Sequence, residues 1–306
     1  MKIVVMAAGA VGGYFGARLA ATGEDVHFIA RGAHLEAIQQ TGLRLESLLG
    51  DVHIKNARIS DDPTEIGVAD VVLFAVKLWD TEDAGNACKA LLGDNTAIII
   101  LQNGIDGVAR LTPVLGSNPL VSGVVYISAF IERPGVIRHH GNFARLQFGE
   151  KHGDETARLT SFLKVCQRAG IEAEISANIE LAQWQKFVFL VGLSGATTVT
   201  RSGIGAIVAD SDCRLLLLNL MEETAAVGRA RGVALADDYA LNRLAYAENL
   251  PADMKASMLN DLERGKRLEV NWLSGEVARL GRELAIPTPA NDAVYAALKL
   301  HRGGTD

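Results

Sequence analysis

The segment from residue 3 to residue 16 constrains the fold of this chain most, because an apolar run meets a glycine-rich turn there. It reads Ile-Val-Val-Met-Ala-Ala-Gly-Ala-Val-Gly-Gly-Tyr-Phe-Gly, and a helical pattern follows. In a strand, turn and helix of this kind, Gly9 lets the backbone approach a pyrophosphate and Gly12 lets helix and strand pack closely. The helix N-terminus offers free N–H groups to the anion. The pattern indicates a dinucleotide-binding turn made of Ala7, Ala8, Gly9, Ala10, Val11 and Gly12.

Ala7 departs from this pattern, because the first glycine of the fingerprint belongs at its position. Residue 7 must then adopt a negative φ or carry a conformational cost that glycine avoids. An ordinary strand–turn–helix packed by small residues is the alternative interpretation. The place of the turn after the first strand of a domain favours the dinucleotide site, as does a second signal after the next strand.

That second signal is Arg31, which follows a predicted strand at residues 25–30. An acidic residue there would accept hydrogen bonds from ribose hydroxyls and favour NAD, whereas a guanidinium suits a 2′-phosphate. A solvated loop arginine is the alternative. Because no acid competes at this strand end, the sequence favours NADP.

Composition excludes several classes of protein. The chain has 306 residues, 49% of them hydrophobic and 22% charged, with a net charge of −6, which is typical of a globular protein with two domains and without a nucleic-acid surface. The apolar stretches are short, so we expect no membrane span and no signal peptide. The seven histidines show no metal-ligand spacing, and we expect no metal site. We expect Cys88, Cys166 and Cys213 to be reduced core residues of a cytoplasmic protein.

Strand signals stop near residue 178, and helical periodicity follows. We therefore expect an α/β domain over 1–177 and an all-helical domain over 178–306, packed with a cleft between them. Before that point, β-rich runs alternate with helical stretches, as in a Rossmann-type sheet. Expected strands cover 2–7, 25–30, 71–76, 97–101, 120–126, 136–140, 144–149 and 172–176. Expected helices of the second domain cover 178–199, 211–231, 236–249, 251–281 and 290–300.

Further polar residues follow predicted parallel strands, whose carboxyl ends hold ligands in open α/β sheets. Lys77 follows strand 71–76, and Gln102-Asn103-Gly104 follows strand 97–101. Together with Arg31 they indicate a cofactor rim, although Lys77 taken alone fits a solvated loop lysine better.

In the helical half, Lys186 interrupts a strongly apolar helix, where a lysine is costly unless it reaches water, a partner or a ligand. The alternative is a side chain that extends to the surface. Farther on, Ser257 and Asp261 share a helix face at a spacing of four residues, and Glu269 follows two turns later. Each of these acids also fits a solvated helix charge.

The order and spacing of these residues resemble the 2-dehydropantoate 2-reductase (ketopantoate reductase) family over essentially the whole chain. The resemblance rests on the glycine-rich turn, Arg31, Lys77, Leu-Gln-Asn103-Gly104, Trp-Gln-Lys186, Ser257-Met-Leu-Asn-Asp261 and Glu269. It implies an NADP-dependent oxidoreductase of pantothenate biosynthesis that reduces a 2-oxo acid, with ketopantoate as the leading substrate. A paralogous reductase of another oxo acid and a non-catalytic NADP-binding regulator are the alternatives. Helical domains of this kind often pair, so a homodimer stays open.

The resemblance also implies a role for each residue. Residues 7–12 would hold the pyrophosphate and Arg31 the 2′-phosphate. Lys77, Asn103 and Ala129 would line the cofactor site, with Asn103 also near the substrate. Lys186 would be the general acid, Ser257 would contact the substrate carboxylate, and Glu269 would anchor the nicotinamide end. Hydride transfer to a ketone builds negative charge on oxygen, which an ammonium group can stabilise and protonate.

The substrate positions depart from the family. Its helix carries asparagines four and eight residues after the lysine, and this chain has Leu190 and Ser194 there. A third family asparagine falls near Ile204. We therefore expect Leu190 and Ser194 to line a substrate site that differs from that of the family, with Thr197 and Thr198 as substitutes from a neighbouring face.

Overall fold

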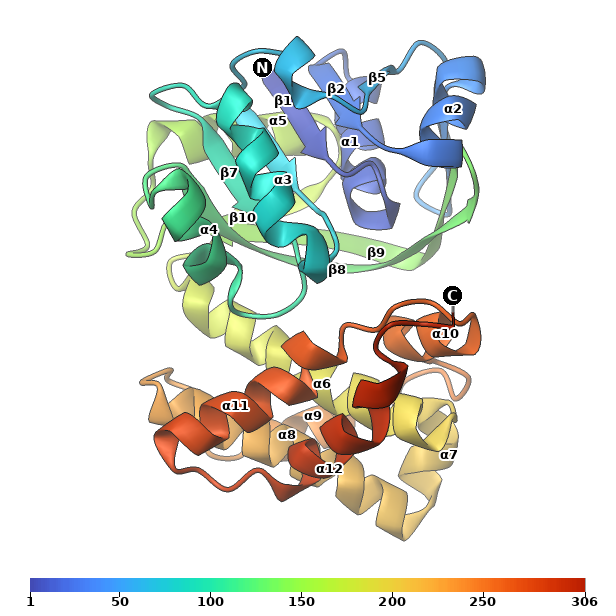
Figure 1. Ribbon diagram of the computed structural model, residues 1–306, viewed down its shortest axis with the longest axis vertical. Coiled ribbons are helices and arrows are strands. Elements are labelled where there is room, and N and C mark those ends of the chain that lie inside the picture. The colour runs from blue at the N-terminus through green and yellow to red at the C-terminus, as the bar shows by residue number, and fades with distance from the viewer. Residues whose placement is uncertain (306) are drawn as a thin grey trace. The chain divides into compact units, whose positions relative to one another are not determined.

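The computed structural model describes residues 1–305 and divides into two compact units, Met1–Ala182 and Gln183–Asp306 (Figure 1). The first unit contains β1 (Lys2–Met6), α1 (Ala10–Ala21), β2 (Asp25–Ile29), α2 (Gly32–Thr41), β3 (Leu43–Ser47), β4 (Val52–Ile54), β5 (Arg58–Ser60), β6 (Val71–Phe74), α3 (Thr81–Cys88), β7 (Ala97–Ile100), α4 (Gly107–Leu115), β8 (Leu120–Arg133), β9 (Val136–Gly149), α5 (Ala157–Arg168) and β10 (Glu172–Ile175).

The strands form one ten-stranded sheet in the order β4-β3-β9-β8-β7-β6-β1-β2-β5, and β10 pairs with β9. Strands from β8 to β5 in this order are parallel, whereas β8–β9 and β3–β4 are antiparallel. Strand β1 pairs with β2 on one side and with β6, which comes later in the chain, on the other side. The turn after β1 therefore lies at a topological switch point, where open α/β sheets bind ligands.

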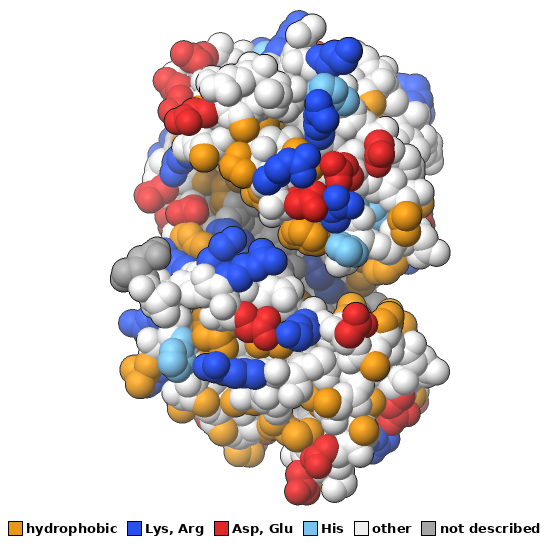
Figure 2. All heavy atoms as spheres, turned by 90° about the vertical axis from the view of Figure 1, so that its right-hand side faces the viewer, with side chains coloured by type: hydrophobic (Ala, Val, Ile, Leu, Met, Phe, Trp, Pro, Cys, Tyr) orange, Lys and Arg blue, Asp and Glu red, His pale blue; other side chains and the backbone are white. Residues whose placement is uncertain are grey.

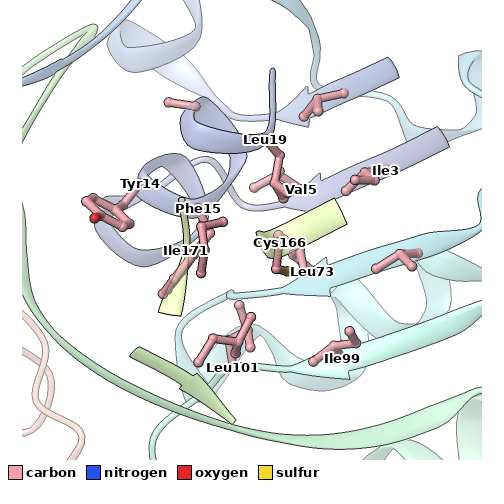
Figure 3. Packing of buried hydrophobic residues seen from close by; sticks show 14 of the residues in the cluster. Ile3, Val5, Tyr14, Phe15, Leu19, Leu73, Ile99, Leu101, Cys166 and Ile171 are labelled. Atoms are coloured by element: carbon pink, nitrogen blue, oxygen red, sulfur yellow. The ribbon is translucent and has the colours of Figure 1, made fainter. Parts of the chain in front are cut away.

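Both faces of the sheet are buried, which explains why its central strands are continuous apolar runs. In β1, Ile3 and Val5 belong to one core cluster, whereas Val4 and Met6 belong to the cluster on the other face. Figure 3 shows the first cluster, in which Phe15 and Leu19 of α1 pack with Leu73, Ile99 and Cys166. The predicted Rossmann-type fold of the first unit is confirmed.

Some predicted strand limits are wrong. Strand β8 continues to Arg133, so Ala129 lies inside a strand and pairs with His139, rather than following a strand that ends at 126. The runs 136–140 and 144–149 form the single strand β9, which is antiparallel to β8 as predicted. The sequence did not predict β3, β4 and β5, which are short and carry exposed charged residues such as Arg44 and Arg58.

The second unit is helical, as predicted. Its elements are α6 (Ile179–Thr200), which begins at the end of the first unit, α7 (Ile204–Ala209), α8 (Ser211–Ala230), α9 (Tyr239–Ala247), α10 (Ser257–Glu263), the short 3-10 helix η4 (Val270–Trp272), α11 (Ser274–Leu284) and α12 (Pro289–Leu298). The Asp210 side chain caps α8 by accepting from the backbone N–H groups of Asp212 and Cys213, at 3.1 and 2.9 Å. After α8, Gly232 adopts a φ of 87°, as expected of a glycine that follows a helix.

The predicted helix over 251–281 is wrong, because the chain forms α10, η4 and α11 there. Gly265 follows α10 with a φ of 66°, and its carbonyl accepts from the N–H of Thr305 at 2.9 Å. The chain thus leaves the helical path soon after α10 ends.

Cys88 and Cys166 are buried, and burial raises the pKa of each thiol to about 12. Cys213 is half-exposed near the start of α8, so its expected place in the core is wrong. Among the described residues, every helix is too short or too polar to cross a lipid bilayer.

Candidate active site

The carboxyl ends of four parallel strands bring the predicted cofactor residues of the first unit to one edge of the sheet. Met6, the last residue of β1, lies opposite Ile29 of β2 and Phe74 of β6, and Phe74 lies opposite Ile100 of β7. The glycine-rich turn, Arg31, Lys77 and Asn103 follow these aligned strand ends within a few residues. These residues therefore follow one edge of the sheet.

The glycine-rich turn has the space that a pyrophosphate needs. A Cβ built on Gly9 would meet no atom within 4 Å, whereas a Cβ on Gly12 would lie 2.3 Å from the Ala7 carbonyl oxygen and 2.8 Å from Val5 Cγ1. Gly9 precedes α1 as its N-cap and provides no side-chain cap, which leaves the first helical N–H groups to a ligand. The residues present therefore fit a dinucleotide phosphate.

Ala7 adopts a φ of 75°, in the left-handed region that favours glycine. Of the two possibilities that the sequence allowed, the structure shows the strained one. The departure from the fingerprint thus changes the residue but keeps the backbone conformation that glycine would have.

Arg31 is the N-cap of α2 and has an exposed side chain and an extended backbone. Gly32 after it has a φ of 55°, so the chain turns sharply into the helix directly behind Arg31. This geometry leaves the guanidinium accessible to a ligand at the end of β2.

Lys77 and Asn103 follow β6 and β7. The Lys77 side chain is exposed, with Nζ 5.5 Å from the centre of the Trp79 ring. Asn103 is half-buried. Gln102 joins the two loops, since its Nε2 donates to the carbonyl of Val76 at 3.0 Å and to the hydroxyl of Thr81 at 2.9 Å. Sequence reasoning noted Gln102 only as a neighbour of Asn103, because a long-range side-chain contact leaves no local pattern.

In the helical unit, Lys186 lies on α6 and is half-buried. Burial lowers its pKa to about 8, and the Glu269 carboxylate acts in the opposite direction. Glu269 itself is 8% exposed and precedes η4, where its carbonyl accepts from the Trp272 N–H at 3.0 Å. The fold thus brings together a lysine and a carboxylate that lie far apart in the sequence.

Leu190 lies one turn after Lys186 on α6 and is half-buried, whereas Ser194 is 1% exposed. The hydroxyls of Ser194 and Thr198 are buried without a hydrogen-bond partner within residues 1–305. Thr197 donates to the carbonyl of Leu193 at 2.7 Å, so its hydroxyl is already used. Of these three buried side chains of α6, Ser194 and Thr198 thus have hydroxyls that stay available for a hydrogen bond.

Ser257 is the first residue of α10 and is exposed. Its expected helical relation to Asp261 is confirmed, because α10 contains both residues. The expected continuation to Glu269 is wrong, since α10 ends at Glu263. Glu269 is brought to its position by the loop and η4 instead.

The described part of the chain, residues 1–305, contains no cluster of three or more histidine, cysteine or acidic side chains that could hold a metal ion. On the face drawn in Figure 2, the lysine and arginine side chains of the first unit lie among aspartate and glutamate side chains. This face of the first unit therefore has a mixed charge.

Proteins of similar sequence are oxidoreductases. The chain is 34% identical to a 2-dehydropantoate 2-reductase of Mesorhizobium japonicum, over 98% of this chain and 97% of that protein. It is 30% identical to the uncharacterized oxidoreductase YkpB of Bacillus subtilis, over 98% of this chain and 99% of that protein.

Solved structures agree over the full length. The chain matches a PanE/ApbA family ketopantoate reductase from Ralstonia eutropha with a TM-score of 0.90 and 36% identity, covering 99% of this chain and 98% of that one. A D-mandelate dehydrogenase solved with NADH and anilino(oxo)acetate has a TM-score of 0.90 at 20% identity and shares the fold.

The two halves of the chain match two family descriptions in turn. Residues 3–153 match "Ketopantoate reductase PanE/ApbA", and residues 178–302 match "Ketopantoate reductase PanE/ApbA C terminal". The cofactor of such an oxidoreductase is a nicotinamide dinucleotide, which fits the turn at Gly9. The chain belongs to the ketopantoate reductase family.

Proposed function

We propose that this protein reduces a 2-oxo acid to the 2-hydroxy acid with NADPH. The observation that carries the proposal is Lys186, a half-buried lysine with a pKa of about 8 and a carboxylate, Glu269, acting on it. A general acid is most effective when its pKa lies near the working pH. The alternative, a lysine that merely extends to the surface, would keep a pKa close to that of a solvated amine.

The cofactor residues of the first unit have separate tasks. The N–H groups at the start of α1 bind the pyrophosphate across the open space at Gly9. Arg31, exposed at the end of β2, binds the 2′-phosphate and sets the preference for NADPH over NADH. Lys77, Asn103 and Ala129 line the rest of the site. When bound, NADPH supplies the hydride that reduces the carbonyl carbon.

The residues of the helical unit serve the substrate. Lys186 donates a proton from Nζ to the carbonyl oxygen as that oxygen gains negative charge. Ser257, exposed at the start of α10, contacts the substrate carboxylate, and Glu269 anchors the nicotinamide end.

Ketopantoate is the leading substrate, supported by the 34% identity to a 2-dehydropantoate 2-reductase. Leu190 favours a second candidate, a 2-oxo acid with an apolar side chain. A substrate hydroxyl that loses its hydrogen-bond partner on binding costs about 1–3 kcal/mol, and a leucine offers no partner.

The test is the oxidation of NADPH, followed by absorbance, with a panel of 2-oxo acids that includes ketopantoate and apolar analogues of similar size. We expect turnover of at least one member, with NADPH preferred over NADH. The absence of turnover with every member, while NADPH still binds, would contradict the proposed reaction. Turnover with NADH alone would contradict the role of Arg31.

A further inference from the structure

His34 lies on α2, three residues after Arg31, and bonds to two segments far away in the sequence. Its Nε2 is 2.9 Å from the Ala8 carbonyl oxygen, and its Nδ1 is 3.1 Å from the backbone nitrogen of Gly135. A backbone N–H can only donate, so Nδ1 accepts the hydrogen bond from Gly135. Nε2 of the neutral ring then carries the proton and donates it to the carbonyl of Ala8. Burial lowers the pKa of His34, which favours this neutral form.

With the hydrogen bond to His34, both backbone polar groups of Ala8 in the glycine-rich turn have partners. The N–H of Ala8 donates to the Ile29 carbonyl at the end of β2, at 2.7 Å, and its own carbonyl accepts from His34. Ala8 is 1% exposed, so a carbonyl left without a partner there would be costly. Ala7, directly before it, holds a φ of 75°, and a strained backbone persists only where its surroundings fix it.

The bond to Gly135 connects the end of the β8–β9 ribbon to the same helix. Gly135 has a φ of 79°, and a Cβ built on it would lie 3.3 Å from the Cβ of Ala37 on α2. Its carbonyl accepts from the N–H of Arg44 at 2.9 Å. The turn of the ribbon therefore packs against α2, and His34 lies where this turn, the start of α2 and the glycine-rich turn meet.

We propose that His34 is a positioning residue that sets the spacing between the glycine-rich turn and Arg31. It acts through Ala8 and does not touch the ligand. Through this link, the N–H groups that face the pyrophosphate and the guanidinium that faces the 2′-phosphate keep one fixed arrangement. The inference rests on the proposed use of NADPH, since the two phosphate contacts belong to that cofactor.

Two substitutions separate the two hydrogen bonds of His34. A glutamine places an amide N–H close to the position of Nε2, so His34→Gln keeps the donor to Ala8 and loses the acceptor for Gly135. An asparagine places its carbonyl oxygen close to the position of Nδ1, so His34→Asn keeps the acceptor and loses the donor. His34→Ala loses both. His53→Asn is the matched control, because the Nε2 of His53 bonds the Thr41 carbonyl at the other end of α2, at 2.8 Å.

We expect His34→Asn and His34→Ala to weaken NADPH binding about tenfold, which corresponds to the loss of one buried hydrogen bond. His34→Gln and His53→Asn should stay within about threefold of the parent. At saturating NADPH all four variants should keep kcat, because His34 holds the site and takes no part in the chemistry. Equal losses for His34→Gln and His34→Asn, or wild-type affinity in His34→Asn, would overturn the proposal.

Amide hydrogen exchange without any cofactor gives a second, independent readout. Exchange in residues 8–12 should accelerate in His34→Asn and stay unchanged in His34→Gln. If the parent protein does not bind NADPH at all, the proposed function fails while this measurement still decides the role of His34. Unchanged exchange in His34→Asn would overturn that role.

Discussion

The Glu269 carboxylate raises the pKa of Lys186 and thereby opposes burial, which lowers it. Burial is the larger effect, and the pKa is about 8. Burial disfavours the ammonium form because that form loses hydration, whereas a nearby negative charge favours it. A lysine balanced in this way can donate a proton near neutral pH and then take one up again.

This balance predicts the pH dependence of the reaction. In the proposed reaction the ammonium form of Lys186 is the proton donor, and this form is populated below the pKa. The kcat should therefore be constant at lower pH and fall as the pH rises through about 8. Glu269→Gln removes the charge that raises the lysine pKa, so the midpoint should move to lower pH. The measurement is kcat at saturating substrate and cofactor across pH. An identical midpoint in both proteins would contradict the pairing.

Arg31→Ala should weaken NADPH binding about tenfold or more and leave NADH binding nearly unchanged, because one charge-assisted contact is worth roughly 1.5–3 kcal/mol. Titration of the protein with each cofactor measures the dissociation constants of NADPH and NADH. Arg44→Ala is the control. Arg44 is also exposed, but it lies on β3, which is near the opposite end of the strand order from β2. An equal loss for NADPH and NADH would contradict the 2′-phosphate contact.

Ala7→Gly should increase the free energy of unfolding by about 0.5–1 kcal/mol, because relief of the left-handed backbone outweighs the entropy that glycine loses on folding. We expect NADPH affinity to change by less than about tenfold, since the turn already has the conformation that glycine would adopt. Ala285→Gly is the matched control, because Ala285 has a φ of 55° at the end of α11. Denaturant unfolding measures the free energy of unfolding of both variants.

If Ala7→Gly tightened NADPH binding by much more than about tenfold, while Ala285→Gly did not, the alanine at position 7 would be shown to weaken NADPH binding by the glycine-rich turn. A loss of stability in Ala7→Gly alone would contradict the strain at residue 7.

Much of the sheet edge that carries the glycine-rich turn could be predicted from the sequence, because its signals are local. A glycine-rich turn after an apolar strand, and polar residues directly after strands, are read from neighbouring positions, and parallel pairing then aligns Arg31, Lys77 and Asn103. The roles of these residues in NADPH binding belong to the proposed function.

The rest depended on contacts between distant segments. Helical periodicity over 251–281 concealed the break after α10, where residues 265 and 305 pair through their backbones. The limits of β8 were missed because β9 extends it by antiparallel pairing through Arg133. The hydrogen bonds of His34 join three segments, and no periodic pattern predicts such a junction.

Leu190→Asn should improve kcat/KM for ketopantoate relative to an apolar 2-oxo acid, because it restores an amide one turn after Lys186. In the parent protein we expect poor kcat/KM on ketopantoate and better turnover of an apolar oxo acid. Leu190 is half-buried and accepts the change more easily than Ser194, which is 1% exposed, so Ser194→Asn belongs in a second, combined variant. Competition between the two substrates measures the shift. A parent protein that prefers ketopantoate over every apolar analogue would contradict this argument.

The measurement that tests the central claim most directly is the turnover of Lys186→Ala, with its NADPH affinity determined on the same sample. General acids contribute roughly 10²–10⁴ in rate, so kcat should fall on that scale with the best 2-oxo acid of the panel. NADPH affinity should stay close to that of the parent protein. A Lys186→Ala variant that retains near-normal kcat would contradict the account and leave Lys186 as a side chain that merely extends to the surface.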